Sequence, residues 1–331
     1  MLMSNRVLNK EEFELIKKML GSTQEGLKLS METFLSTVYK DRVVSTPEYL
    51  IAFGDIPVGL VAHLDTVHTT PVKDLFYDKE QNVMWSPQGI GADDRAGVFA
   101  IVEILKRGLR PTIILTTDEE IGGVGASKLV EDIPEAPCKL NFLIELDRRG
   151  SEDCVFYDCD NPFFEDYIED FGFITNWGSF SDISYIAPKW GMAAVNLSIG
   201  YEHEHSKSEI LNISWMFNTI DKVCNILENV HEEDVFEYIP AKNPFQNYGC
   251  YDIGYDYDPS FQHWKRDDKK ELCWGCLGGF DKDIIITPMD GEGKYCPDCY
   301  SQKFSTCLTC GTDFRDEHKV HLNCEKCRGE N

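Results

Sequence analysis

The chain has 331 residues, 42% hydrophobic and 12% aromatic, which suffices for one large core and a smaller module. Its formal net charge of −25 argues against nucleic acid or an anionic membrane as the main partner. The charged N-terminus lacks a signal-peptide core and no apolar run is long enough to span a bilayer, so we expect a cytoplasmic protein without transmembrane segments.

Strands and helices are predicted to alternate through the first 230 residues. Helices are expected at residues 10–20, 26–39, 97–106, 126–130, 163–170 and 209–230, and strands at 49–53, 59–62, 111–116, 140–146, 155–157 and 193–199. This order predicts an α/β domain with a mixed, mostly parallel central sheet flanked by helices. In such sheets, functional groups collect at the carboxyl ends of the strands.

The chain is expected to have three parts. A catalytic domain is predicted over residues 1–234, and a small zinc-stabilised module over residues 272–331. Between them, residues 235–271 include an acidic, Tyr- and Gly-rich stretch with little periodicity. This composition is typical of a linker, or of a strap across a domain surface.

Five short segments carry acidic residues or histidine where predicted strands end or a helix begins. They are His63-Leu64-Asp65, Asp93-Asp94, Glu119-Glu120, Asp147 and the pair His203 and His205. Carboxylates gathered at one sheet edge repel one another unless a cation lies among them. The segments therefore predict a metal site, and their number suits two metals.

The local spacing gives these residues different predicted uses. Asp93 begins a helix, where the dipole favours a carboxylate, and its two oxygens can bridge two cations. Glu119 and Glu120 are adjacent at a strand end, so one can bind metal while the other serves as base. Three carboxylate ligands and a bridging hydroxide carry about −4, which two divalent cations neutralise. Imidazole and carboxylate ligands favour zinc, with manganese or cobalt as substitutes.

The ordered motifs VAHLDTV, GIGADDRAGV, TTDEEIGG, IELD and HEHS..E resemble those of the co-catalytic zinc exopeptidase clan, which includes tripeptidase-type and aminopeptidase-type enzymes. The resemblance covers roughly residues 45–230. It implies a zinc exopeptidase-like fold with metal ligands at His63, Asp93 (bridging), Glu120, Asp147 and His205. It also implies Asp65 behind His63, Glu119 as general base, and often a cis peptide after Asp93.

Some parts of the resemblance leave alternatives open. His205 matches the family pattern H-[ST]-x-x-E, and His203 is the weaker candidate for the last ligand. Ser181 and Asp182 resemble a pair that shapes the substrate pocket of aminopeptidase relatives, and Arg148 is a weak candidate for contact with a substrate carboxylate. Only 57 residues separate Asp147 from His205, which favours the single-domain branch without a lid or dimerisation insertion.

Eight cysteines form four CxxC pairs in the C-terminal part: Cys273, Cys276, Cys296, Cys299, Cys307, Cys310, Cys324 and Cys327. This spacing predicts two structural zinc sites of four thiolates each, in a treble-clef or LIM-like module. Sequential pairing, first pair with second and third with fourth, is favoured, and a cross-braced pairing is the alternative. The segment is slightly acidic, which favours contact with a protein partner over nucleic acid.

Together these features predict a metal-dependent hydrolase that cleaves a peptide or amide bond, most directly an aminopeptidase-type exopeptidase. A metal-bridging hydroxide activated by Glu119 would attack the carbonyl of a small peptide or amide substrate. Two alternatives stay open. One is an amidase or deacylase acting on a non-peptide amide, and the other is a zinc-binding adaptor protein with a vestigial site.

Overall fold

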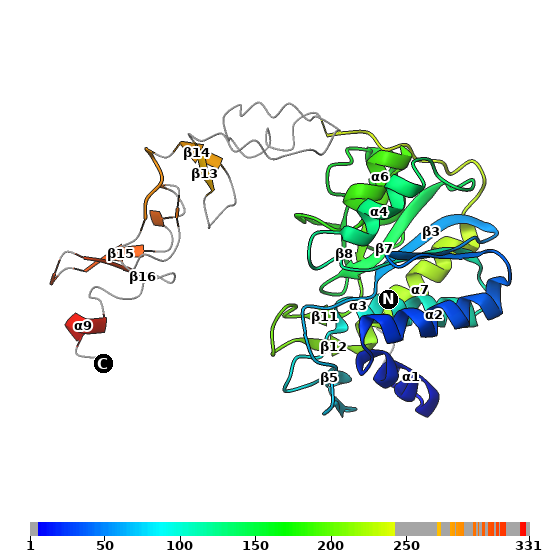
Figure 1. Ribbon diagram of the computed structural model, residues 1–331, viewed down its shortest axis with the longest axis horizontal. Coiled ribbons are helices and arrows are strands. Elements are labelled where there is room, and N and C mark those ends of the chain that lie inside the picture. Colours follow the sequence, from blue (N-terminus) through cyan, green and yellow to red (C-terminus); the bar gives the residue numbers. More distant parts are fainter. Residues whose placement is uncertain are drawn as a thin grey trace. The chain divides into compact units, whose positions relative to one another are not determined.

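The computed structural model describes residues 6–241 and, toward the C-terminus, residues 270–272, 279–281, 283–287, 294–295, 297, 300–301, 304–307, 309–310, 312–315 and 325–328. The chain divides into two compact units, Met1–Tyr251 and Asp252–Asn331. The first unit is an α/β domain built on one large sheet (Figure 1). The predicted fold class is confirmed.

The central sheet of the first unit has eight strands in the order β1-β2-β6-β3-β7-β10-β8-β9. Its middle four strands, β6, β3, β7 and β10, run parallel, and most antiparallel pairs lie toward the edges. The bounds are β1 Val43–Ser45, β2 Tyr49–Ala52, β3 Ile56–His63, β6 Pro111–Thr116, β7 Phe142–Arg148, β8 Asp153–Val155, β9 Ile174–Thr175 and β10 Ala194–Ser198. All six residues of β6 are buried, as expected of a strand covered on both faces.

Helices cover both faces of this sheet (Figure 1). One core includes side chains of α1, α2, α3, α5 and α7 with one face of the sheet, and the other includes α4 and α6 with the opposite face. The bounds are α1 Lys10–Leu20, α2 Gln24–Tyr39, α3 Ala92–Lys106, α4 Val124–Asp132, α5 Pro162–Glu169, α6 Ile183–Trp190 and α7 Ile213–Asn229. Among the described residues, no helix combines the length and apolar character that a bilayer crossing requires.

A second, four-stranded antiparallel sheet lies in the same unit, in the order β11-β12-β5-β4. Its strands are β4 Phe76–Asp78, β5 Val83–Trp85, β11 Tyr201–Glu202 and β12 Ile210–Asn212. The helix predicted from residue 209 is therefore wrong at its start, because residues 210–212 pair with β5 instead. Asn212 then caps α7 by accepting a hydrogen bond from Trp215 N.

The chain after α7 continues along the first unit. Phe236 exchanges backbone hydrogen bonds with Asn141 and Ala193, and Pro240 forms a β-bridge with Cys159. Residues 235–241, the start of the predicted linker, thus lie against the α/β domain. The Tyr- and Gly-rich stretch that follows is outside the described residues.

The described residues of the second unit include two short hairpins and the helical turn α9. The strands are β13 Lys270–Leu272, β14 Gly279–Asp281, β15 Phe304–Thr306 and β16 Asp313–Arg315, and the helix is α9 Glu325–Arg328. Tyr295 and Phe304 are buried, with ring centroids 5.4 Å apart, and Tyr300 stacks on Phe304 at 4.7 Å. Among the described residues of this unit, the hydrophobic cluster is small and contributes little folding free energy, in keeping with the prediction that metal stabilises the unit.

Candidate metal centre

The predicted site residues converge on one edge of the central sheet. His63 is the last residue of β3, Asp147 lies near the end of β7, and Glu119 and Glu120 follow β6. Because these three strands are parallel neighbours, their carboxyl ends meet at the same edge. Asp93 reaches this edge from the first turn of α3.

Two sets of three side chains form around Asp93. In the first set, His63 Nε2 lies 3.1 Å from Asp93 Oδ1 and 3.5 Å from Asp147 Oδ1. In the second, His205 Nε2 lies 3.2 Å from Asp93 Oδ2 and 3.0 Å from Glu120 Oε2. Within each set the potential ligand atoms all lie within 4.8 Å of one another. Asp93 thus offers one carboxylate oxygen to each set.

The last histidine of the site lies on the turn between β11 and β12. The structure brings His205 to the carboxylates, although its side chain remains 54% exposed. His203 is exposed, and its carbonyl accepts a hydrogen bond of 2.6 Å from the Ser206 hydroxyl. Of the two histidines, it is therefore His205 that joins a candidate metal-binding set.

Asp65 links the first histidine to the two glutamates. Its Oδ1 lies 3.1 Å from His63 Nδ1, so the other ring nitrogen faces Asp93. The backbone N–H groups of Glu119 and Glu120 each donate to Asp65, at 3.1 Å. A carboxylate in this position fixes the orientation of the imidazole.

Two further residues support the candidate ligands and were not assigned roles from the sequence. The Tyr201 hydroxyl donates to Asp147 Oδ1 at 3.0 Å. Glu209 accepts the backbone N–H groups of Gly91 and Asp93, both at 3.0 Å. Glu209 was visible in the sequence as the end of the H-[ST]-x-x-E pattern. Nothing in the sequence pointed to Tyr201, because its contact with Asp147 joins two different sheets, and no local pattern predicts that contact.

The Asp93–Asp94 peptide is cis. Asp94 lies beneath the site, where it accepts hydrogen bonds from His63 N at 3.2 Å and from Gly97 N at 2.9 Å. It is fully buried. Its carboxylate therefore ties the end of β3 to the first turn of α3.

The carboxylates of the site disturb one another electrostatically. Burial and then neighbouring carboxylates raise the pKa of Glu119 and of Glu120 to about 7. Burial, followed by repulsion from Asp93, raises the pKa of Asp147 well above its usual value. The hydrogen bond to Asp93 raises the pKa of His205 to about 9. Without a cation, the site thus retains protons that cations would displace.

The chemistry of the donors fits divalent cations. Glu120 Oε1 is buried and has no hydrogen-bond partner among the described residues, although its other oxygen faces His205. A buried carboxylate oxygen left unpaired is costly unless a cation or water occupies the space before it. Imidazole nitrogen with carboxylate oxygen is a donor set that zinc accepts.

The weaker substrate-contact candidates lie in different surroundings. Asp182 precedes α6 and accepts a hydrogen bond from the Thr116 hydroxyl, while its other oxygen and the Ser181 hydroxyl are buried without partners among the described residues. The charge of Glu119 contributes to raising the pKa of Asp182 to about 7, after burial. Arg148 instead pairs with Asp153 at 3.6 Å.

A cavity of about 580 Å³ adjoins the site. Asp65 and Glu120 form part of its wall, and the rest comes from the loop over residues 66–72, the start of α2 and the start of α3. The cavity is large enough for a small organic ligand.

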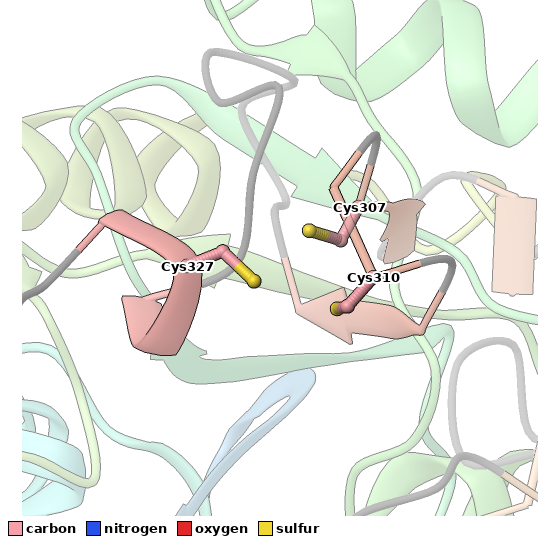
Figure 2. A group of neighbouring side chains, drawn as sticks. All are labelled: Cys307, Cys310 and Cys327. Atoms are coloured by element: carbon pink, nitrogen blue, oxygen red, sulfur yellow. The ribbon is translucent and has the colours of Figure 1, made fainter.

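In the second unit, three of the eight predicted zinc-binding cysteines are described. The sulfur atoms of Cys307, Cys310 and Cys327 all lie within 4.8 Å of one another. Figure 2 shows Cys307 and Cys310 on the connection between β15 and β16, and Cys327 on α9. The remaining predicted ligands, Cys273, Cys276, Cys296, Cys299 and Cys324, lie outside the described residues.

No protein-family model and no curated protein sequence matches this chain. Solved structures do match its fold. The aminopeptidase PepT from Bacillus cereus aligns with a TM-score of 0.52 at 14% identity, covering 67% of this chain and 98% of that one. A tripeptidase from Staphylococcus aureus gives 0.54 at 14% identity, with 67% and 99% covered. The TET aminopeptidase from a Thaumarchaeota archaeon gives 0.52 at 14% identity, with 68% and 99% covered. The chain therefore has a fold found in peptidases.

Proposed function

We propose that the chain is a metal-dependent hydrolase of peptide or amide bonds, most directly an aminopeptidase-type exopeptidase. One observation carries the proposal: two overlapping sets of ligand-type side chains share the carboxylate of Asp93. The fold shared with aminopeptidases and a tripeptidase supports the reaction class. The chain between Asp147 and His205 supports the branch without an inserted lid. Its strands β8, β9, β10 and β11 all belong to the two sheets of the first unit, and its helices are α5 and α6.

In this proposal His63 and Asp147 would hold one divalent cation, Glu120 and His205 would hold a second, and Asp93 would be a ligand to both. Zinc suits these donors best, and manganese or cobalt can replace it. When bound, paired cations of this kind polarise a substrate carbonyl and lower the pKa of water. Asp65 keeps His63 in the tautomer and orientation that the first set requires.

Glu119 is the proposed general base. It follows β6 directly before the Glu120 of the second set but belongs to neither set, which leaves its carboxylate available to accept a proton. Its carboxylate would accept a proton from the attacking water and pass it to the leaving amine. Asp182, whose pKa the charge of Glu119 helps to raise, and the neighbouring Ser181 would shape its surroundings.

The test of the base is Glu119→Gln, measured with a panel of aminoacyl substrates and N-acyl amino acids. We expect the native chain to hydrolyse one class, which separates peptidase from amidase, and the variant to lose at least about 10²-fold in kcat. Glu131→Gln, on the exposed end of α4, is the matched control. Glu119→Gln should keep the metal content and the thermal unfolding temperature of the native chain. Undiminished turnover by Glu119→Gln would remove the assignment of the base.

For the C-terminal part, we propose the module over residues 272–331, with two structural zinc ions and sequential pairing of the CxxC pairs. The proximity of Cys327 to Cys307 and Cys310 supports sequential pairing, since cross-bracing would separate the third and fourth pairs. Cys324 would be the fourth ligand. The first zinc site would use Cys273, Cys276, Cys296 and Cys299. This module is the proposed contact surface for a protein partner.

We further propose that the protein acts in the cytoplasm. The cysteines of the first unit that the structure describes are Cys138, Cys154, Cys159 and Cys224, and no disulfide joins them. Scattered thiols of this kind, beside thiolate metal sites, are typical of a reducing compartment.

A further inference from the structure

The start of α3 carries a buried arginine for which the proposed metal chemistry has no use. Arg95 is only 4% exposed. Its Nη2 donates a hydrogen bond of 3.0 Å to the carbonyl of Ser22, and its Nε is buried without a partner. Among residues 6–241, no carboxylate forms an ion pair with it. Buried guanidinium groups are ordinarily paired, because burial of an unpaired charge is unfavourable.

Asp65 and Glu209 are the two carboxylates whose charges act on Arg95, but both form hydrogen bonds with other groups. Asp65 accepts from two backbone N–H groups and faces His63. Glu209 accepts from two backbone N–H groups and lies 3.1 Å from His68. The guanidinium of Arg95 therefore lacks the direct counter-ion that its burial calls for.

Arg95 lines the cavity of about 580 Å³ that also includes Glu120. Thr66 lines the same cavity, and its buried hydroxyl has no partner among the described residues. A Cβ added to Gly91 would lie 3.0 Å from Thr66 Oγ1 and 3.4 Å from Arg95 Nη1. The hydroxyl and the guanidinium therefore flank the same small space, which the absence of a side chain at Gly91 keeps open.

Several other polar groups of the cavity wall are already paired. Asp118 and Gln24 exchange two hydrogen bonds, each of 3.0 Å. Glu120 faces His205 at 3.0 Å. Glu25, Thr69 and Thr70 line the cavity from exposed positions. Among the buried groups of its wall, those without a hydrogen-bond partner in the described residues, apart from Glu120 Oε1, are a cation and a hydroxyl, at Arg95 and Thr66. This is the combination that recognises a carboxylate, because a guanidinium can donate two parallel hydrogen bonds to its oxygens.

We propose that Arg95 and Thr66 bind a free carboxylate of the substrate. The inference rests on the proposed hydrolase function and narrows its substrates to short peptides or N-acyl amino acids with a carboxylate close to the cleaved bond. The carboxylate can come from the C-terminus of a dipeptide or from an acidic side chain, and both sources present the same two oxygens.

The kinetic test compares substrates that differ only in this group. Leucylglycine is paired with leucylglycinamide, and aspartylglycinamide with asparaginylglycinamide. We expect the native enzyme to prefer the carboxylate member of at least one pair by about tenfold or more in kcat/KM. Arg95→Gln should abolish that preference, mainly by raising KM for the carboxylate member much more than for the amide member. Arg42→Gln, at an exposed ion pair with Asp55, is the control.

A binding measurement separates this inference from the proposed function. Titration calorimetry with N-acetylglycine and N-acetylglycinamide, on metal-loaded protein of measured zinc content, should show binding of the acid that Arg95→Gln weakens by about tenfold or more. If Arg95→Gln fails to fold, Thr66→Val should show the same direction with a smaller loss.

Each result has a defined meaning. Hydrolysis of both members of both pairs at equal rates would overturn the carboxylate subsite and leave the hydrolase intact. Equal loss on acid and amide in Arg95→Gln would overturn it too, by indicating that Arg95 only positions Asp65 and Glu209. Arg95-dependent binding of the acid without hydrolysis of any substrate would uphold the subsite and remove the proposed function.

Discussion

Asp147 shows how one side chain depends on a neighbour from another sheet. Its Oδ1 faces His63 and also accepts a hydrogen bond from the Tyr201 hydroxyl. A partner of this kind holds a carboxylate in the orientation a cation needs, and its loss typically lowers metal affinity about 10–100-fold. The hydroxyl is therefore expected to matter for metal binding more than for folding.

Tyr201→Phe tests this expectation. We expect metal affinity, measured by competition with a chromophoric chelator, to fall about 10–100-fold while the fold is retained. Tyr167→Phe is a suitable control, because the Tyr167 hydroxyl has no hydrogen-bond partner among the described residues. Equal affinities of the native chain and Tyr201→Phe would contradict a role for this hydrogen bond.

The titrating side chains of the site predict how the metal-free protein responds to pH. Folding raises the pKa of Glu119 and Glu120 from 4.5 to about 7, so the folded state retains protons that the unfolded chain has released. Their contribution to stability therefore declines from pH 4.5 to about 7. The pKa of His205, raised from 6.5 to about 9, extends the decline to about pH 9.

Urea midpoints of chelator-treated protein should therefore fall from pH 5 to pH 9, and zinc should remove much of the trend. A midpoint that rises over this range would show that the carboxylates do not crowd one another in solution.

At the scale of elements, the site depends on how closely α3 approaches the central sheet. Gly97 lies in α3, where an added Cβ would meet the Leu146 carbonyl oxygen of β7 at 2.3 Å and Asp94 Oδ1 at 2.4 Å. No side chain fits there without moving the helix. The same turn carries Asp93, so a shift of α3 would displace the bridging carboxylate.

Gly97→Ala is therefore expected to destabilise the protein by about 1–3 kcal/mol, the usual effect of overpacking. It should also weaken binding of both cations in the first unit. Gly26→Ala is the matched control, since its Cβ would meet only Thr23 Oγ1, at 3.3 Å, and alanine favours helix. Urea unfolding and zinc titration check both effects. If Gly97→Ala were as stable as the control, α3 would be able to move away from the central sheet without loss of stability.

The strongly apolar or periodic elements were predictable from sequence. The strand over 111–116 was predicted at its observed bounds, because its apolar centre Ile-Ile-Leu, flanked by β-branched threonines, suits a buried strand. Helix α6 was not predicted, since Pro188 inside it indicates a break rather than a helix. Strands β4, β5, β11 and β12 were missed too, because two or three residues give too short a pattern to recognise.

At the scale of the whole molecule, the two units predict four bound zinc ions of two kinds. Cys307→Ser should reduce the metal content by one ion, because a hydroxyl replaces one of the thiolates grouped in Figure 2. Elemental analysis should then give about three ions per chain. Cys138→Ser, at a thiol of the first unit, should leave the count unchanged. A full complement of zinc in Cys307→Ser would exclude this cysteine from the site.

The candidate metal centre was more predictable than its surroundings. The order of the motifs grouped His63, Glu120 and Asp147, because the carboxyl ends of parallel strands meet at one edge. Contacts such as Arg95 to Ser22 depend on how loops from distant positions pack, and no local pattern encodes them. The sequence already favoured His205 over His203 through the H-[ST]-x-x-E pattern, and in the structure it is His205 that faces Asp93 and Glu120.

The exposure of His205 also bears on how fast a bound metal ion would exchange with solvent. Its side chain is 54% exposed on a turn between two short strands, whereas that of His63 is 1% exposed at the end of β3. An ion held through His205 can exchange with solvent by a small movement of this turn, without any opening of the central sheet. An ion held through His63 would be bound by a buried side chain, so we expect it to exchange more slowly. Loading and loss of the two metals are therefore expected to follow a fixed order, with the ion at His205 arriving last and leaving first.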